Sequence, residues 1–184
     1  MFSAIGPGMF GVGIGFAMER EHGMMTLKRA LPMPPAANLI ARVLTSSVLA
    51  LIAITLLIGI SMLWGHVDLN AGQVARFVLV GALGVMPFCA FGLMLASFVS
   101  GQASPAVVNL IYFPMIYLSG LFPFPLPAAL QTAAAFWPAF HLNQLSFAAL
   151  GLKTALSPWY AAGVLELFSI VCVIVAARRL SREG

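Results

Sequence analysis

Charged side chains are scarce in this chain, and almost half of them fall in one short stretch. The 184 residues include nine Lys or Arg and five Asp or Glu, and six of these fourteen lie between residues 19 and 42. They are Glu19, Arg20, Glu21, Lys28, Arg29 and Arg42. The acids come first and the bases follow, an order that complements the dipole of a helix beginning near Glu19. Met24, Leu27 and Leu31 recur at helical spacing and give that helix one apolar side.

We therefore expect a short amphipathic helix at a membrane surface over this stretch. Its spacing fits two roles equally well. The helix could anchor and orient the protein at the interface, or it could dock a soluble partner. In the second case its charges would determine which partner binds more than how tightly it binds.

Glu166 is an isolated acid inside an apolar segment, about two helical turns after Pro158. A carboxylate within a membrane span costs roughly 2.5–3.5 kcal/mol on insertion scales, so such residues are commonly functional. We expect Glu166 to face a permeation path, or to pair with Lys153 or His141. The alternative, equally weighted, is a shallow and hydrated position.

Polar residues in two other apolar stretches are further candidates. His141 and Asn143 follow Pro138 and could line an outer gate, although capping of broken helix ends is the favoured interpretation. Asn109 could donate a hydrogen bond across a subunit interface. Tyr112 and Tyr117 could line the same path, with packing favoured over that role.

Enzymatic and metal chemistry find little support. Cys89 and Cys172 lie in apolar segments without CxxC spacing, which is typical of small packing residues. Ser, His and Asp form no triad-like pattern, and no GxxxxGK[ST] sequence for nucleotide binding occurs. We therefore expect no catalytic residue, metal or cofactor on this chain, and the net charge of +4 does not indicate nucleic acid.

The composition requires that these residues be positioned by membrane-spanning helices. Hydrophobic residues make up 61% of the chain and charged residues 8%, whereas a soluble domain has about a quarter of its residues charged. No charged residue occurs from Phe77 to Leu152. A span needs roughly 20 mostly apolar residues. Five segments qualify: Phe2 to Met18, Val43 to Trp64, Phe77 to Val99, Pro105 to Phe122, and Trp159 to Ala177.

The distribution of Lys and Arg predicts the orientation of these five spans. The first loop and the C-terminus lie on one side and carry seven basic residues, while the other side carries only Arg76 and Lys153. The positive-inside rule places the basic side in the cytoplasm. Within the third segment, the small residues Gly81, Gly84, Gly92 and Ala96 are expected to permit close helix packing.

The connection from Pro123 to Pro158 is too apolar for an ordinary loop. Ala128 to Phe136 and Leu142 to Leu150 predict two short helices separated by Trp137-Pro138. Neither is long enough to span, so we expect a re-entrant or interfacial hairpin on the outer side. The predicted fold is an all-α integral membrane protein with five transmembrane helices, a cytoplasmic coupling helix and this outer hairpin.

Three stretches together resemble ABC-2 type transporter permeases. The first is Glu19-Arg20-Glu21-x-Gly23 followed by Thr26-Leu27-Lys28-Arg29 and a proline, which resembles the ERExGT-type loop of that family. The second runs from Tyr112 to Pro123 and is similar to the family's fifth helix and its apolar end. The third runs from Trp137 to Leu145 and is similar to the outer re-entrant segment.

This resemblance implies one ABC-2 type transmembrane domain over residues 1–184, in which the five segments match the second to sixth spans of the family. On that match, the family's N-terminal amphipathic helix and first span are expected to be missing. The resemblance also implies a plasma-membrane exporter subunit with a cytoplasmic C-terminus. It would form a homodimer or pair with a related permease, and each copy would dock a separate ATP-binding subunit that holds the ATP. The implied coupling loop comprises Glu19, Arg20, Glu21, Gly23, Thr26, Leu27, Lys28 and Arg29.

Two other classes of function remain open from the sequence. One is a non-transporting membrane anchor or assembly protein that carries a surface helix. The other is a proton-coupled secondary transporter with Glu166 as the proton carrier. Against the second, only one acid lies within the spans and no inverted repeat is visible.

Overall fold

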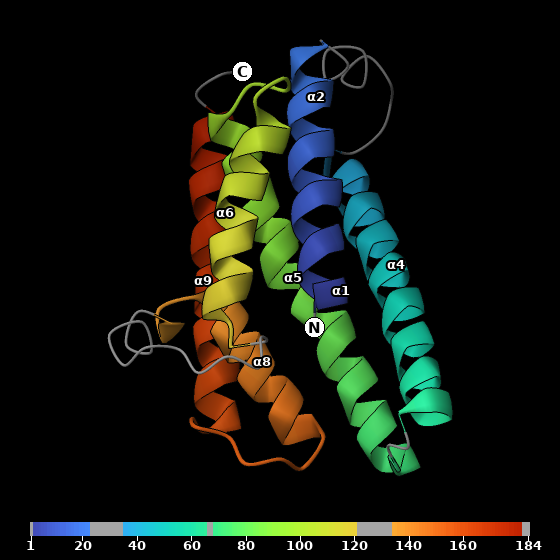
Figure 1. The fold of residues 1–184 in the computed structure, drawn as a ribbon. Helices are drawn as coiled ribbons and strands as arrows, with labels where there is room; N and C mark the ends of the chain where they lie inside the picture. The colour runs from blue at the N-terminus through green and yellow to red at the C-terminus, as the bar shows by residue number, and fades with distance from the viewer. Residues whose placement is uncertain (1, 23–34, 66–67, 121–133, 182–184) are drawn as a thin grey trace.

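The computed structural model describes residues 2–22, 35–65, 68–120 and 134–181. Within these ranges the regular structure is helical, and the helices lie lengthwise side by side in one bundle (Figure 1). Among the described residues, three helices are long and apolar enough to cross a membrane. They are α4 (Pro35–Trp64), α5 (Ala71–Phe98) and α9 (Pro158–Leu180). The second, third and fifth predicted segments correspond to these three helices.

The first predicted segment forms a helical rod made of three abutting elements. These are α1 (Phe2–Gly6), the π-helix η1 (Pro7–Ile14) and α2 (Gly15–Glu21). The rod extends three residues beyond the predicted end at Met18. The π-helical stretch was not expected from the sequence. It begins at Pro7, which has no N–H to donate to the α-helical ladder.

The fourth predicted segment is shorter than expected. Helix α6 (Ser104–Leu118) has 15 residues, Ser119 is its C-cap, and Gly120 follows with a φ of 73°. A positive φ suits glycine just after a helix end. The remaining residues of that segment, Leu121 and Phe122, lie outside the described residues. The described part of this segment is therefore too short to span a membrane on its own.

The predicted outer hairpin is described only in its second half. Helix α8 runs over Pro138–Ala149, so it begins four residues before the predicted start at Leu142. The sequence predicts a break at Trp137-Pro138, but Pro138 occupies the first turn of α8, where proline is favoured because no N–H partner is needed there. Residues 128–133 of the other predicted helix lie outside the described part of the chain.

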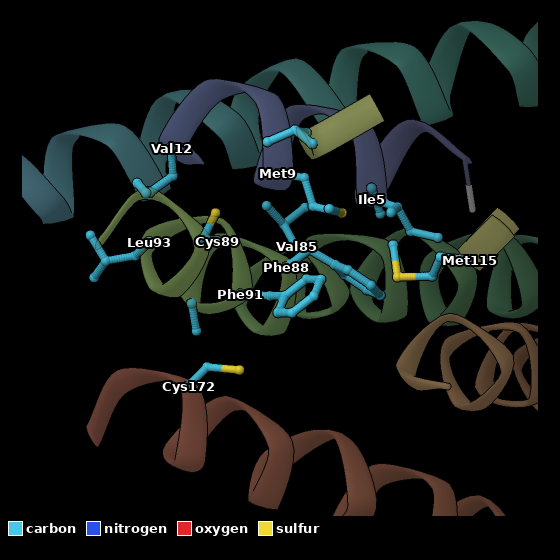
Figure 2. Close-up of a cluster of buried hydrophobic side chains, with 14 of the residues drawn as sticks. Ile5, Met9, Val12, Val85, Phe88, Cys89, Phe91, Leu93, Met115 and Cys172 are labelled. Carbon is cyan, nitrogen blue, oxygen red and sulfur yellow. The ribbon is translucent and has the colours of Figure 1, made fainter. Parts of the chain in front are cut away.

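Helix α5 is the central element of the bundle, and more than half of its most apolar stretch is buried. Figure 2 shows its Val85, Phe88 and Cys89 beneath the first helical rod, and Cys172 of α9 on the opposite side. Both cysteines are buried and free, as expected for packing residues. An exposed capping box of Asn70 and Gln73 begins α5.

Glycines permit the closest contacts that α5 makes, as the sequence predicted. A Cβ placed on Gly92 would lie 3.0 Å from the backbone nitrogen of Gly13, so two backbones meet directly there. A Cβ on Gly81 would collide with Ile54, and one on Gly84 with Leu142. A side chain at position 92 would have to move a backbone, whereas one at position 81 or 84 would have to displace the tip of a side chain.

Candidate functional site

One end of the bundle gathers most of the described charged side chains. The end of α2, the turn between α5 and α6, and the end of α9 meet there (top of Figure 1). Glu19, Arg20 and Glu21 are the last three residues of α2, and His22 is its C-cap. The expectation of a helix beginning near Glu19 was therefore wrong, because α2 continues through these residues without a break.

Glu19 pairs with Arg42 across two helices. Its Oε1 lies 2.5 Å from Nη2 of Arg42 in α4, and both side chains are about one fifth exposed. A carboxylate at a helix C-terminus faces the negative end of the dipole, so this partner offsets an unfavourable position. The pair joins the two helices that flank residues 23–34.

Arg20 and Arg179 converge on the same backbone oxygen. Nη1 of Arg20 and Nε of Arg179 each donate to the carbonyl of Ser97, both at 3.0 Å. Arg20 also donates to the carbonyl of Val99 at 3.3 Å, and the Arg179 guanidinium lies 4.6 Å from the ring centroid of Phe98. The last carbonyls of α5 carry partial negative charge, so two cations stabilise its C-terminus.

Glu21 binds the turn that follows α5. Its Oε2 accepts a hydrogen bond of 2.9 Å from the backbone N–H of Gln102. Gly101 is buried beside it, and a Cβ there would lie 2.6 Å from the same oxygen and 2.9 Å from the Cα of Met18. Glycine at 101 is therefore what lets α2 lie directly against the turn.

Three consecutive residues of the predicted coupling loop thus contact three different elements of the bundle. Glu19 contacts α4, Arg20 contacts the end of α5, and Glu21 contacts the turn between α5 and α6. Arg20 and Arg179 make α9 part of the same arrangement through Ser97. The remaining predicted loop residues lie outside the described part of the chain: Gly23, Thr26, Leu27, Lys28 and Arg29.

The sequence did not reveal the partners of these charged residues. Ser97 and Gln102 contribute backbone groups, for which residue type gives no signal. Arg42 was noted only as a charge at the edge of the loop, and Arg179 only as a basic residue that sets orientation. The sequence offered one clue to the ion pair: the opposite charges of Glu19 and Arg42 flank the same connection.

His141 and Asn143 are buried in α8 at 1% and 3% exposure. Nε2 of His141 lies 2.9 Å from the carbonyl oxygen of Ala135, so it carries the hydrogen of this bond. Asn143 donates its side-chain amide to the carbonyl of Ser119, the C-cap residue of α6, at 3.1 Å. These are contacts with interrupted helix ends, of the kind that the capping interpretation describes. A role in an outer gate stays a prediction.

The polar candidates of α6 are placed on different sides of that helix. Asn109 donates to the carbonyl of Pro105 in its own helix at 2.9 Å. Tyr112 packs edge-on against Phe10 of the first rod, with ring centroids 5.0 Å apart. The side chain of Tyr117 is 46% exposed, so it lies on the surface of the bundle.

Glu166 lies on the exposed side of α9, whereas Leu165 beside it is buried in the core. Within the described residues no hydrogen bond or ion pair of Glu166 with Lys153 or His141 is present. His141 instead lies edge-on to Tyr160, with ring centroids 6.1 Å apart. The structure therefore brings together Glu19, Arg20 and Glu21, and leaves Glu166 apart from them.

Comparison with known proteins gives two matches. Residues 1–150 match the sequence profile of the family described as ABC-2 type transporter. A relative from Bacillus subtilis (strain 168), named "Putative transport permease YvfS", is 23% identical over 145 residues. The aligned part is 78% of this chain and 59% of the relative, so the chain spans about three fifths of that protein's length. Since the profile covers well over half of the chain and three of the described helices are long and apolar enough to span, this multi-pass membrane protein belongs to the ABC-2 type transporter family.

Proposed function

We propose that the chain is the permease subunit of an ATP-driven exporter and that a separate ATP-binding subunit docks on the loop at residues 23–34. Family membership supports a transport permease. The observation that carries the finer proposal is the triple contact of Glu19, Arg20 and Glu21 with α4, α5 and the turn after α5. A loop whose base is held on three elements can pass a displacement to all of them together.

The proposed coupling step is mechanical. Closure of two ATP-binding subunits would press on the loop, and the Glu19–Arg42 pair would make α2 and α4 move as one unit. Arg20 and Glu21 would pass the same displacement to the end of α5 and to the turn that begins α6. The helices would then alternate between inward-open and outward-open arrangements, as in other two-state transport elements.

Exposed aromatic and basic residues support the placement of the helices in the bilayer. Trp64 ends α4 and Trp159 begins α9, and they are 83% and 88% exposed. Tryptophan is enriched at membrane interfaces. From Arg42 to Trp64, and from Trp159 to Arg178, the helices rise by about 33 and about 29 Å, close to a hydrocarbon core of about 30 Å. The charged end would face the cytoplasm.

The first rod and α6 would complete five spans in this placement, together with the undescribed residues that follow α6. Asn109, Tyr112, Tyr117, His141, Asn143 and Glu166 stay the candidate residues of the translocation path and outer gate. Glu166 would lie about 10 Å from the Trp159 level. A carboxylate at that depth is stable only against protein or water, so its side of α9 would face a second permease subunit or the path.

The proposal is tested with the full-length permease and a candidate ATP-binding protein, which we expect a neighbouring gene to encode. The two should co-purify, and transport in proteoliposomes should require ATP. Glu21→Ala should lower transport severalfold because it removes the acceptor for the Gln102 N–H. The matched control is Gln102→Ala, which keeps that backbone donor and should transport normally. Failure to co-purify, together with normal transport by Glu21→Ala, would refute the proposal.

The proton-coupled alternative gives a different pattern in the same assay. Transport would continue without ATP and would stop in Glu166→Gln, because the amide cannot carry a proton. A permease driven by ATP should instead depend on the partner in every variant. The two outcomes separate the classes without knowledge of the natural substrate, since a panel of lipophilic dyes can serve as the transported probe.

A further inference from the structure

The π-helix η1 is the most unusual backbone in the described part of the chain. It covers eight residues, Pro7–Ile14, within a rod that is α-helical on both sides. π-Helices bond residue i to i+5, are rare, and mostly occur as single turns inside α-helices, often at functional sites. A stretch of this length needs contacts that favour it over the narrower α-helix.

Two side chains of α4 supply such contacts. Ser46 donates its hydroxyl to the carbonyl of Pro7 at 3.0 Å, and Arg42 donates Nη1 to the carbonyl of Gly11 at 3.2 Å. The donors are four residues apart on α4, and the acceptors are four residues apart on the rod, in the opposite order. This two-bond ladder draws main-chain oxygens of the π segment outward toward α4.

Glycines make the ladder possible. A Cβ on Gly11 would lie 2.9 Å from Oγ of Ser46, and a Cβ on Gly15 would overlap the guanidinium of Arg42. On the side facing α5, a Cβ on Gly8 would lie 2.9 Å from the Cβ of Phe88. The π segment therefore fits between α4 and α5 only because it presents glycines to both helices.

Arg42 connects this ladder to the charged end. The guanidinium that donates to Gly11 through Nη1 also pairs with Glu19 through Nη2. Its Nε is buried and has no hydrogen-bond partner among the described residues. One side chain thus contacts both the π segment and the base of the loop, and a displacement of Glu19 or α4 would alter the bond to Gly11.

We propose that residues 7–14 are a switchable segment, and that Ser46 and Arg42 are positioning residues that hold it in π geometry. When α4 shifts and the ladder breaks, the segment reverts to α-helical bonding. That change narrows the helix and turns residues 2–6 relative to α2, which rotates the side of the rod that faces α6. This inference rests on the proposed function for the cause of the α4 shift. The ladder itself, which consists of the two hydrogen bonds from Ser46 and Arg42, does not depend on that function.

The ladder is tested on the full-length permease alone, in lipid nanodiscs, by hydrogen–deuterium exchange of the amides of residues 8–14. Ser46→Ala and Arg42→Gln should each speed this exchange about tenfold, the effect of losing one hydrogen bond that stabilises a local structure. Thr45→Ala is the matched control, because its hydroxyl is exposed and donates to Ala41 within α4. Exchange equal to that of Thr45→Ala in both variants would overturn the proposal.

Gly11→Ala provides a second route if Arg42→Gln fails to fold. The added methyl displaces the Ser46 hydroxyl without removing it, so it should reproduce the faster exchange. An unchanged exchange rate in Gly11→Ala would count against the ladder in the same way as an unchanged rate in Ser46→Ala.

The switch itself is tested in proteoliposomes with the ATP-binding partner, by the amount of dye transported per ATP hydrolysed. Ser46→Ala and Arg42→Gln should lower this ratio at least threefold while ATP hydrolysis continues, and Thr45→Ala should keep it. A ratio that stays at the wild-type value in both variants would overturn the switch. Absence of ATP-driven transport in the wild-type protein would instead refute the proposed function, and the exchange experiment would still decide the ladder.

Discussion

At the scale of single residues, Ser97 presents one carbonyl oxygen to two guanidinium groups from distant parts of the chain. An oxygen with two lone pairs can accept both bonds, and its place at the end of α5 increases the attraction for cations. Either arginine alone can neutralise that helix end. The arrangement therefore gives the charged end a redundant attachment, which can be measured as an interaction between two substitutions.

Arg20→Gln and Arg179→Gln should each destabilise the protein by about 1 to 2 kcal/mol, and the double variant by more than their sum, because the last donor to Ser97 is then lost. Thermal unfolding of the detergent-solubilised protein measures both values. Arg178→Gln is the control, since Arg178 is exposed beside Arg179 and should unfold like wild type. Strict additivity of the two substitutions would contradict the shared-acceptor interpretation.

Asn143→Ala should destabilise the protein by about 1 to 3 kcal/mol, because it removes the buried hydrogen bond that the Asn143 amide donates to the carbonyl of Ser119. The comparison is Asn109→Ala, whose amide bonds only within its own helix and whose loss should cost less than about 1 kcal/mol. Thermal unfolding of both variants gives the difference. If Asn143→Ala is as stable as Asn109→Ala, the bond does not hold α8 against α6.

At the scale of elements, the sequence predicted where helices lie along the chain better than it predicted their backbone geometry. The uncharged runs of α4, α5 and α9 predicted these helices because a span must be long and apolar. Pro138 was misjudged, because the same proline that breaks a helix interior also favours a helix start. The π form of residues 7–14 depends on Ser46 and Arg42 of another helix, so no local pattern could reveal it.

Backbone contact between the first rod and α5 gives a prediction at this scale. Gly92→Ala should destabilise the bundle by about 1 to 3 kcal/mol, because its Cβ would press on the backbone of Gly13. Gly163→Ala is the matched control in α9, where a Cβ meets nothing within 4 Å. That change should stabilise the helix by up to about 1 kcal/mol. Opposite signs in thermal unfolding are expected, and equal signs would contradict the close approach.

At the scale of the whole molecule, the end of α2 and the end of α9 lie at the same end of the bundle. The sequence predicted this from the number of spans between the first loop and the C-terminus. The end of α4, the start of α5 and the connection at residues 150–157 lie at the other end (Figure 1). The side chain of Gln73 fastens that second end by donating to the carbonyl of Leu150 at 2.8 Å. The charged side chains of the candidate site could be foreseen as a group from their rarity, whereas their partners required the three-dimensional fold.

Thiol labelling in cells tests the orientation of the bundle. Asp68→Cys and Lys153→Cys should react with a membrane-impermeant maleimide added from outside, and Ser181→Cys should react only in inside-out vesicles. All three positions are exposed, and the native Cys89 and Cys172 are buried and should give little background. The reverse labelling pattern would show that the charged end faces outward.

The shared oxygen of Ser97 also has a consequence for biosynthesis. Arg20 emerges from the ribosome before α5, and Arg179 emerges after it, as part of α9. The first helix can therefore attach to α5 as soon as α5 is inserted, but the second guanidinium arrives only once α9 has been made. Assembly of the charged end thus takes two steps, and the second step waits for α9.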